Sequence, residues 1–174
     1  SVTMKQHNIL FIGHGGISGI YIQAFSKLPR VNIVGVVGRS EQRVKDYALA
    51  NNIPFYGTSI KEVAKLSHAT AAVICTPNAL HFQGVMEASA LGLHCLCEKP
   101  LHISPAKQEE MISSCKTNGV KLAVSYMRRY IPHIQFIKKI VDSGKLGKLL
   151  VVDATIKNFR AKEYYQSWHG TNEV

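Results

Sequence analysis

The stretch Asn8-Ile-Leu-Phe-Ile-Gly-His-Gly-Gly-Ile-Ser-Gly-Ile-Tyr-Ile-Gln-Ala-Phe25 joins an apolar run to a glycine-rich turn and then to an amphipathic segment. The apolar run, residues 9–12, is typical of a strand that is covered on both faces. Beyond the turn, apolar residues recur at the spacing of one helical face: Ile17, Ile20, Tyr21, Ala24, Phe25 and Leu28. The stretch therefore predicts a strand, a tight turn and a helix in immediate succession.

The glycines of this turn predict a phosphate-binding site. Gly13 permits the tight turn, Gly15 lets the backbone approach a pyrophosphate closely, and the amides at the helix start face the anion. An ordinary strand-to-helix loop is the alternative, but the strand before and the helix after supply the context that the motif requires. We assign no catalytic role to His14, whose side chain faces either the cofactor or solvent. The residues assigned to the phosphate site are Gly13, Gly15, Gly16, Ile17 and Ser18, a small residue at the third glycine position.

The end of the second predicted strand, Val31–Val37, indicates which dinucleotide binds. An NAD-binding unit carries an acidic residue about 20 residues beyond the glycine turn, where it accepts hydrogen bonds from the adenosine ribose. Arg39 occupies that place here, and Ser40 follows it. A guanidinium grips a 2′-phosphate that a carboxylate would repel, and a hydroxyl donates to it. The sequence thus predicts NADP(H) in preference to NAD(H), with Arg43 either a second contact or a solvated arginine.

Composition limits the class of protein. The 174 residues are enough for one complete domain and part of another, and 46% of them are hydrophobic. The net charge of +10 comes from lysines and arginines that are scattered along the chain without an arginine-rich tract. We therefore expect a general attraction for anionic ligands and no nucleic-acid binding. No apolar run is long enough to span a membrane and no signal-peptide pattern is present, so we expect a cytoplasmic protein.

The four cysteines do not predict a disulfide framework or a metal site. Cys95 and Cys97 lie in an apolar run without a second pair to complete a zinc site. We expect Cys75, Cys95, Cys97 and Cys115 to be buried thiols in a reducing compartment, and we expect no metal ligands.

Strands and helices alternate along the first three quarters of the chain. Further strands are predicted at residues 53–56, 71–75, 94–97 and 121–126, with helices at residues 41–51, 59–66, 82–90 and 104–119. Ser40, Ser59, Asn78 and Ser104 are predicted helix caps. This alternation indicates an α/β fold, a Rossmann-type doubly wound parallel sheet whose ligands lie at the carboxyl ends of the strands.

Four motifs in this order resemble the glucose-fructose oxidoreductase, inositol dehydrogenase and rhizopine-catabolism (Gfo/Idh/MocA) family. They are Gly13-x-Gly15-Gly16-Ile17-Ser18, Thr76-Pro77-Asn78-x-x-His81, Glu98-Lys99-Pro100 and Arg128-Arg129-Tyr130-x-Pro132. The Glu-Lys-Pro triplet is the most specific of them, and the resemblance covers essentially the whole chain.

The resemblance implies a role for each motif. Lys99 takes the place of the family's lysine beside the nicotinamide and the substrate hydroxyl, where a partly buried ammonium polarises a carbonyl or relays a proton. Glu98 would hold the cofactor end of its loop, and the bond from Lys99 to Pro100 is expected to be cis as in relatives. Thr76, Pro77 and Asn78 would line the cofactor groove. His81 is either a cofactor contact or a structural residue, and Arg128 either touches an anionic ligand or anchors the chain crossover.

Residues 148–159 are predicted to form a long strand. It follows a predicted helix that ends at Gly144 and carries an apolar stripe of Ile134, Ile137, Ile140 and Val141. In the family this strand begins a second domain with an open, mainly antiparallel sheet that carries the substrate pocket and the dimer face. We therefore divide the chain into a dinucleotide-binding domain, residues 1–127, and the start of a truncated α+β domain, residues 128–174. The resemblance places an Asp and a His of the catalytic set farther along, and His169 is not a substitute for them.

The predicted function is that of the NADP(H)-binding part of an oxidoreductase. The resemblance implies hydride transfer between the nicotinamide and a sugar, cyclitol or related polyol, in an enzyme that is a homo-oligomer. We expect this chain alone to bind the dinucleotide without turning over substrate. The alternatives are a non-catalytic dinucleotide-sensing regulator, against which Lys99 argues, and a scaffold without cofactor, against which the glycine turn argues.

Overall fold

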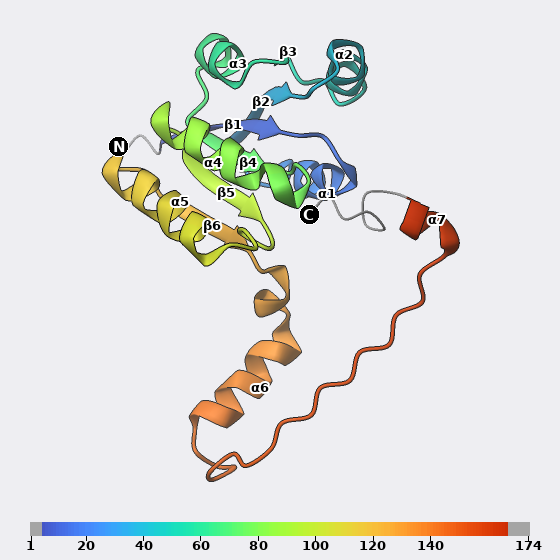
Figure 1. Ribbon diagram of the computed structural model, residues 1–174, viewed down its shortest axis with the longest axis vertical. Coiled ribbons are helices and arrows are strands. Elements are labelled where there is room, and N and C mark those ends of the chain that lie inside the picture. The colour runs from blue at the N-terminus through green and yellow to red at the C-terminus, as the bar shows by residue number, and fades with distance from the viewer. Residues whose placement is uncertain (1–4, 167–174) are drawn as a thin grey trace. The chain divides into compact units, whose positions relative to one another are not determined.

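The computed structural model describes residues 5–166, which divide into two compact units. The first unit ends at Ser125 and contains a six-stranded sheet in the order β3-β2-β1-β4-β5-β6 (Figure 1). Every neighbouring pair of strands is parallel. This is the strand order of a dinucleotide-binding Rossmann sheet, so the predicted fold class is confirmed. Its switch point, where the order reverses, lies between β1 and β4.

The elements of the first unit agree with the predicted ones to within a few residues. The strands are β1 His7–Ile12, β2 Val31–Val37, β3 Phe55–Gly57, β4 Ala71–Ile74, β5 His94–Glu98 and β6 Leu122–Ser125. The helices are α1 Gly16–Phe25, α2 Glu41–Ala50, α3 Ile60–Ser67, α4 His81–Ala90 and α5 Pro105–Thr117, and η1 Asn78–Leu80 is a short 3₁₀ helix.

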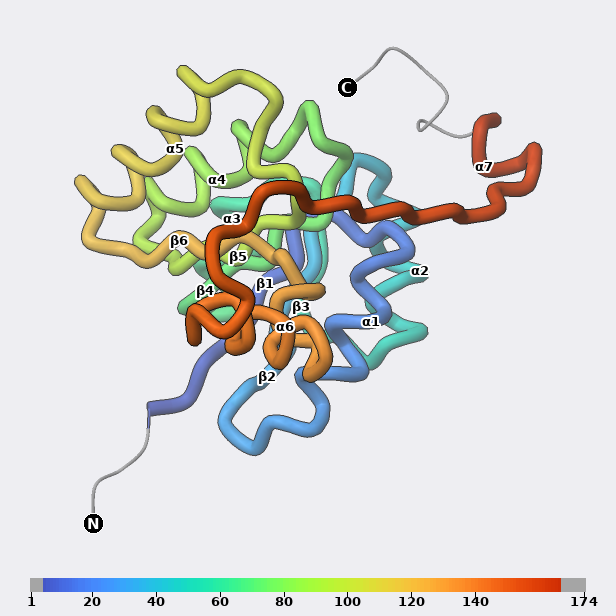
Figure 2. The backbone as a smooth tube through the Cα atoms, turned by 90° about the horizontal axis from the view of Figure 1, so that it is seen from below, coloured from blue at the N-terminus to red at the C-terminus, as the bar shows by residue number. Residues whose placement is uncertain are grey.

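The strands bury side chains on both faces, which explains their continuous apolar sequences. Leu10 of β1 packs among residues of α3, α4 and α5, whereas its neighbour Phe11 packs with residues of α1 and α2. Both side chains have no exposed surface. Figure 2 shows α4 and α5 on one side of the strands and α1 on the other. The carboxyl ends of the strands, where the predicted site lies, are left to the loops.

Three of the four predicted helix caps are confirmed. The hydroxyls of Ser40, Ser59 and Ser104 accept from the backbone amide three residues on, which satisfies a donor that the helix itself cannot pair. The prediction for Asn78 is wrong, because α4 follows Leu80 without a side-chain cap and Asn78 instead opens η1. The chain makes a 3₁₀ turn here before the α-helix begins.

The predicted buried stripe of α1 is only partly correct. Tyr21 is buried, but Ile20 and Leu28 are 53% and 48% exposed, and Ser18 is fully buried in their stead. Apolar residues surround most of this helix, so their spacing leaves the buried face undecided. The polar partners of Ser18 and Tyr21, described below, are found on the face that is buried.

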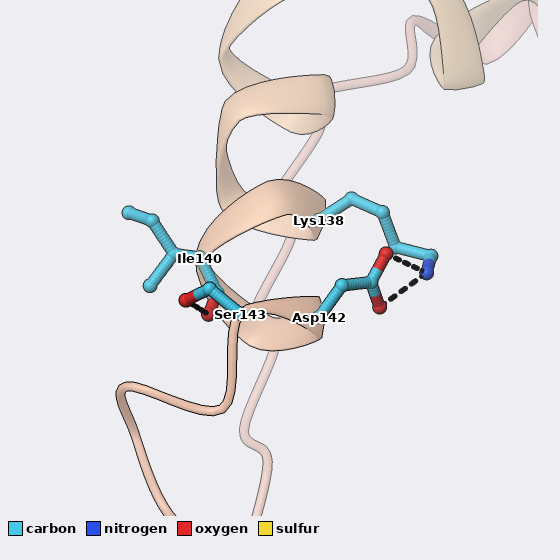
Figure 3. Close-up of polar contacts among 4 residues, drawn as sticks. All are labelled: Lys138, Ile140, Asp142 and Ser143. Carbon is cyan, nitrogen blue, oxygen red and sulfur yellow. Dashed lines mark hydrogen bonds and ion pairs between the residues drawn. The ribbon is translucent and has the colours of Figure 1, made fainter.

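The second unit begins at Tyr126 and is helical where it is regular. It contains η2 Met127–Tyr130, α6 Pro132–Asp142 and α7 Lys162–Gln166. Near the end of α6, Lys138 Nζ pairs with Asp142 one turn on, and the hydroxyl of Ser143 donates to the carbonyl of Ile140 at 2.7 Å (Figure 3). Both charged side chains are more than half exposed, so this pair adds little stability.

The long strand predicted at residues 148–159 is not formed. These residues have no regular secondary structure, and Leu150, Val151 and Phe159 are each more than 80% exposed. A strand requires a neighbour for its backbone hydrogen bonds, and none of the described residues pairs with this segment. His169 lies outside the described residues.

All four cysteines are buried free thiols, as predicted. Burial, with Glu98 nearby, raises the pKa of the Cys75 thiol to about 12, so it stays protonated at neutral pH. Within residues 5–166 no group of three or more potential metal ligands is found. Nor does this part of the chain contain a helix long and apolar enough to cross a membrane.

Candidate dinucleotide-binding site

The glycine turn has the shape of a phosphate-binding loop. Gly13 has a φ of +87°, and a Cβ on it would lie 2.9 Å from both the carbonyl carbon of Cys75 and the amide nitrogen of Thr76. Only glycine therefore allows β1 and β4 to end this close together at the switch point. A Cβ on Gly15 would have its nearest neighbour at 3.7 Å, and Gly16 has open space around it. The start of α1 has no side-chain cap, which leaves it suited to an anion.

Ser18 does more than keep the helix close to the strand. Its hydroxyl donates to the carbonyl of Gly15 at 2.6 Å and lies 2.5 Å from the hydroxyl of Tyr47 on α2. The side chain of Ile17, half-buried, packs with the residues beneath α1 and α2. Hydrogen bonds thus hold the turn from within and tie it to α2. The G-x-G-x-x-G pattern did not indicate Tyr47, because its partner is 29 residues away.

Basic residues surround the end of β2. Arg39, Ser40 and Arg43 are all exposed, and the Ser40 hydroxyl accepts from the Arg43 amide at 3.4 Å as α2 begins. Glu41 is the acidic residue of that first turn. The strand end itself carries no acid, so the guanidinium of Arg39 stands where an NAD-binding unit has its carboxylate. The arrangement suits an anion bound at the start of α2.

His81 links the loops that follow β4 and β5. Its side chain is 1% exposed, with Nδ1 2.8 Å from the carbonyl oxygen of Pro100 and Nε2 3.0 Å from that of Thr76. The structure thus gives His81 structural contacts, and its direct contact with a cofactor stays a prediction. The hydroxyl oxygen of Thr76 is buried without a hydrogen-bond partner among the described residues. Pro77 and Asn78 continue this loop and are half-buried.

A buried carboxylate lies beside Lys99. Glu98 is 8% exposed, and its Oε1 accepts from the hydroxyl of Tyr21 at 2.5 Å. The same hydroxyl lies 2.5 Å from Ser125 Oγ, and Glu98 Oε2 accepts from the Lys99 amide at 3.2 Å. Burial and the Glu98 carboxylate raise the pKa of Tyr21, which keeps its proton available for this bond. The Tyr21 hydroxyl therefore joins α1 to Glu98 of β5 and to Ser125 of β6, and the contact of Glu98 with a cofactor stays a prediction.

Lys99 itself points outward from this network. Its side chain is exposed, so the partial burial predicted for its ammonium is not found in the described residues. The buried part of β5 ends at Glu98, and the bond from Lys99 to Pro100 is cis as predicted. Arg128 belongs to η2 of the second unit and is exposed, and its role stays a prediction.

The loops that carry the predicted site residues follow the carboxyl ends of the strands, as the alternation of strands and helices predicted. The structure brings together Gly13 with Thr76, Thr76 with Pro100 through His81, and Glu98 with Lys99. Sequence reasoning missed the tyrosines that connect these loops. Tyr21 and Tyr47 have no motif of their own, and only the helical position of Tyr21 on an apolar stripe marked it as a core residue.

Strand order, glycine turn and open helix start together define the first unit as a dinucleotide-binding Rossmann domain. A family model described as oxidoreductase family, NAD-binding Rossmann fold, matches residues 7–126. The chain therefore belongs to the Gfo/Idh/MocA family of oxidoreductases.

Two relatives and one solved structure illustrate the similarity. The uncharacterized oxidoreductase YrbE of Bacillus subtilis is 31% identical over 136 residues, which cover 78% of this chain and 40% of the relative. The scyllo-inositol 2-dehydrogenase (NADP(+)) IolU of the same organism is 30% identical over 128 residues, 74% of this chain and 39% of the relative. The WlbA dehydrogenase from Bordetella pertussis was solved with NADH and UDP-GlcNAcA. It superposes with a TM-score of 0.79 at 24% sequence identity, and the match covers 85% of this chain and 43% of the WlbA chain. The chain thus spans about two fifths of the length of these curated relatives.

Proposed function

We propose that this chain is the NADP(H)-binding part of an oxidoreductase that transfers hydride to or from a carbinol carbon of a sugar, cyclitol or related polyol. The observation that carries the proposal is the corner between the glycine turn and the end of β2. There an open helix start adjoins an arginine where an NAD-specific site has an acid. The relative IolU of Bacillus subtilis is a scyllo-inositol 2-dehydrogenase (NADP(+)), which agrees with this proposal.

Different loops of the chain bind different parts of the cofactor. The turn from Gly13 to Ser18 holds the pyrophosphate, and Arg39, Ser40 and Arg43 hold the 2′-phosphate of the adenosine. The β4 loop with Thr76, Pro77 and Asn78 lines the groove toward the nicotinamide, and Glu98 holds the cofactor end of its own loop. When bound, the cofactor supplies or accepts the hydride.

The proton step belongs to Lys99. Its Nζ holds the proton that passes to or from the substrate oxygen, and its positive charge polarises the carbonyl form of the substrate. The Glu98 carboxylate positions this lysine through the bond to the Lys99 amide. His81 positions the same loop from its other side through the carbonyl of Pro100. The substrate pocket and the dimer face belong to the rest of the protein, beyond residue 127.

Calorimetric titration of the 174-residue chain with NADPH and NADH, for the wild type and Arg39→Ala, tests the cofactor assignment. We expect tighter binding of NADPH and loss of the difference in the variant. Equal binding of both cofactors by the wild type would refute the preference for NADP(H). Binding of neither would refute the assignment of the site.

Turnover by the longer protein with a panel of sugars and cyclitols tests the activity. Lys99→Met is expected to abolish turnover while leaving the NADPH affinity nearly unchanged, since the lysine acts on the substrate. A longer protein that binds NADPH and turns over no polyol would instead be a dinucleotide-sensing regulator.

A further inference from the structure

His14 occupies a defined position between the glycine turn and the end of β2. A Cβ on Gly38 would lie 2.6 Å from Nε2 and 2.7 Å from Cδ2 of the imidazole, so the ring rests directly on the Gly38 backbone. Its other neighbour is the ring of Tyr47, at 5.1 Å between centroids and an interplanar angle of 35°. The ring is half-buried. The lack of a side chain at position 38 is therefore what makes room for His14.

The nitrogen atoms of this ring have no hydrogen-bond partner in the part of the chain that the structure describes. Among residues 5–166 neither nitrogen of His14 makes a hydrogen bond, whereas both nitrogens of His81 contact carbonyl oxygens. The nitrogens of this half-buried imidazole are not committed to holding the fold, so they are free to bind a ligand. The structure provides such a place, because Arg39 and Ser40 come directly after Gly38.

We propose that His14 is a further 2′-phosphate ligand, which binds the adenosine end of NADP(H) together with Arg39. The proposal rests on the function proposed above. In Rossmann domains the adenosine ribose lies at the carboxyl end of β2, and in this chain that end is Gly38, on which the imidazole rests. A ring nitrogen of His14 donates to the 2′-phosphate from the side of the glycine turn, and the guanidinium of Arg39 from the side of α2.

Charge around the ring supports an anionic ligand. Arg39 and Arg43 are the basic residues nearest to Gly38 along the chain, and Glu41 is the acidic residue of the same helical turn. Tyr47, on the inner face of α2, contributes a neutral ring whose hydroxyl is engaged with Ser18. The hydrogen bond between Tyr47 and Ser18 fixes α2 to the glycine turn, so the pyrophosphate site and the proposed 2′-phosphate site are held in one rigid corner.

The test is a comparison of His14→Phe with the wild-type chain. Phenylalanine retains a ring over Gly38 but cannot donate a hydrogen bond. We expect NADPH affinity to fall roughly tenfold, the loss of one charge-assisted hydrogen bond, with NADH affinity little changed. Titration with 2′-AMP and 5′-AMP should show the same contrast for the adenosine end alone. His7→Phe, at the amino end of β1 and away from the turn, is the matched control. It should change neither the ratio of NADPH to NADH affinity nor the ratio of 2′-AMP to 5′-AMP affinity.

Each outcome distinguishes this proposal from the function it rests on. A wild-type preference for NADPH that Arg39→Ala abolishes and His14→Phe leaves intact would overturn the role of His14 alone. Equal loss of NADPH and NADH affinity in His14→Phe, with an unchanged unfolding midpoint, would show that the ring only shapes the site. This result would also overturn the role of His14 as a 2′-phosphate ligand. Absence of any wild-type preference would overturn both.

Discussion

Replacing Gly13 and Gly15 by alanine separates the folding role of the turn from its binding role. At Gly13 an L-residue meets a φ of +87°, which costs about 1–2 kcal/mol. Its Cβ would lie 2.9 Å from backbone atoms of Cys75 and Thr76, which cannot rotate away, and overpacking of this kind adds about 1–3 kcal/mol. Gly13→Ala should therefore lower the free energy of unfolding by about 2–5 kcal/mol.

Gly15→Ala should behave in the opposite way. Gly15 has a φ of −69° and a ψ of 178°, which alanine adopts freely, and its Cβ would meet nothing closer than 3.7 Å. The fold should be unchanged or stabilised by about 0.4–1 kcal/mol through the unfolded state. The added methyl group occupies the surface that a pyrophosphate approaches, so NADPH affinity should fall at least roughly tenfold.

Urea unfolding followed by circular dichroism measures the first effect, and calorimetric titration with NADPH measures the second. A Gly13→Ala chain as stable as the wild type would refute the close approach of β1 and β4. A Gly15→Ala chain that binds NADPH normally would show that the turn does not hold the pyrophosphate.

Four further changes test the contacts around the site. Tyr21→Phe removes the hydroxyl that donates to buried Glu98 and should lower the free energy of unfolding by about 1–3 kcal/mol in urea titrations, whereas exposed Tyr56→Phe should not. His81→Ala removes the link between the Thr76 and Pro100 carbonyls and should cost about 2–4 kcal/mol by the same measurement, with exposed His133→Ala as control. Gly38→Ala should cost about 1–3 kcal/mol, and much of that loss should disappear in His14→Ala/Gly38→Ala, because the double variant removes the ring that the new methyl group meets. Burial raises the pKa of the Cys75 and Cys95 thiols to about 12, so above pH 9 the unfolded chain releases protons that the folded chain keeps. The free energy of unfolding from urea titrations should therefore fall as the pH rises from 8 to 10, by up to about 1.4 kcal/mol per pH unit and thiol, and Cys75→Ala should reduce that slope.

The sequence was sufficient for most of the sheet because its central strands, β1 and β4, contain apolar runs that are buried on both faces. Val31–Val37 was predicted with both its ends correct, and the serine caps fixed the starts of three helices. These signals are local, since a cap or a buried run shows itself within a few residues. The strand predicted at residues 148–159 has the same local pattern, but pairing depends on a neighbour that the pattern does not include.

The side-chain contacts of the site could not be predicted in this way. Tyr21 contacts Glu98 and Ser125 across 77 and 104 residues, and Asn8 contacts Thr70 across 62. No spacing rule reaches that far, so a motif names the residues of a loop without naming what holds the loop in place. Ser18 illustrates the difference. The motif predicted a small residue at this position, whereas the hydrogen bond of its hydroxyl to Tyr47 depends on the position of α2 and could not be predicted.

The two hydrogen-bonded connections of the site lie at opposite ends of the proposed cofactor. At the adenosine end, Ser18 and Tyr47 join the glycine turn to α2, and at the nicotinamide end Tyr21 joins α1 to Glu98 beside Lys99. Both connections start from α1, three residues apart, and Ser18 and Tyr21 are the buried residues of that helix. The helix whose amides would face the pyrophosphate in our proposal thus also carries the hydroxyl groups that connect it to α2 and to Glu98. The hydrogen-bonded hydroxyl groups of Ser18 and Tyr21 therefore lie on the face of α1 that is buried, and Ile20 of the same helix is left exposed.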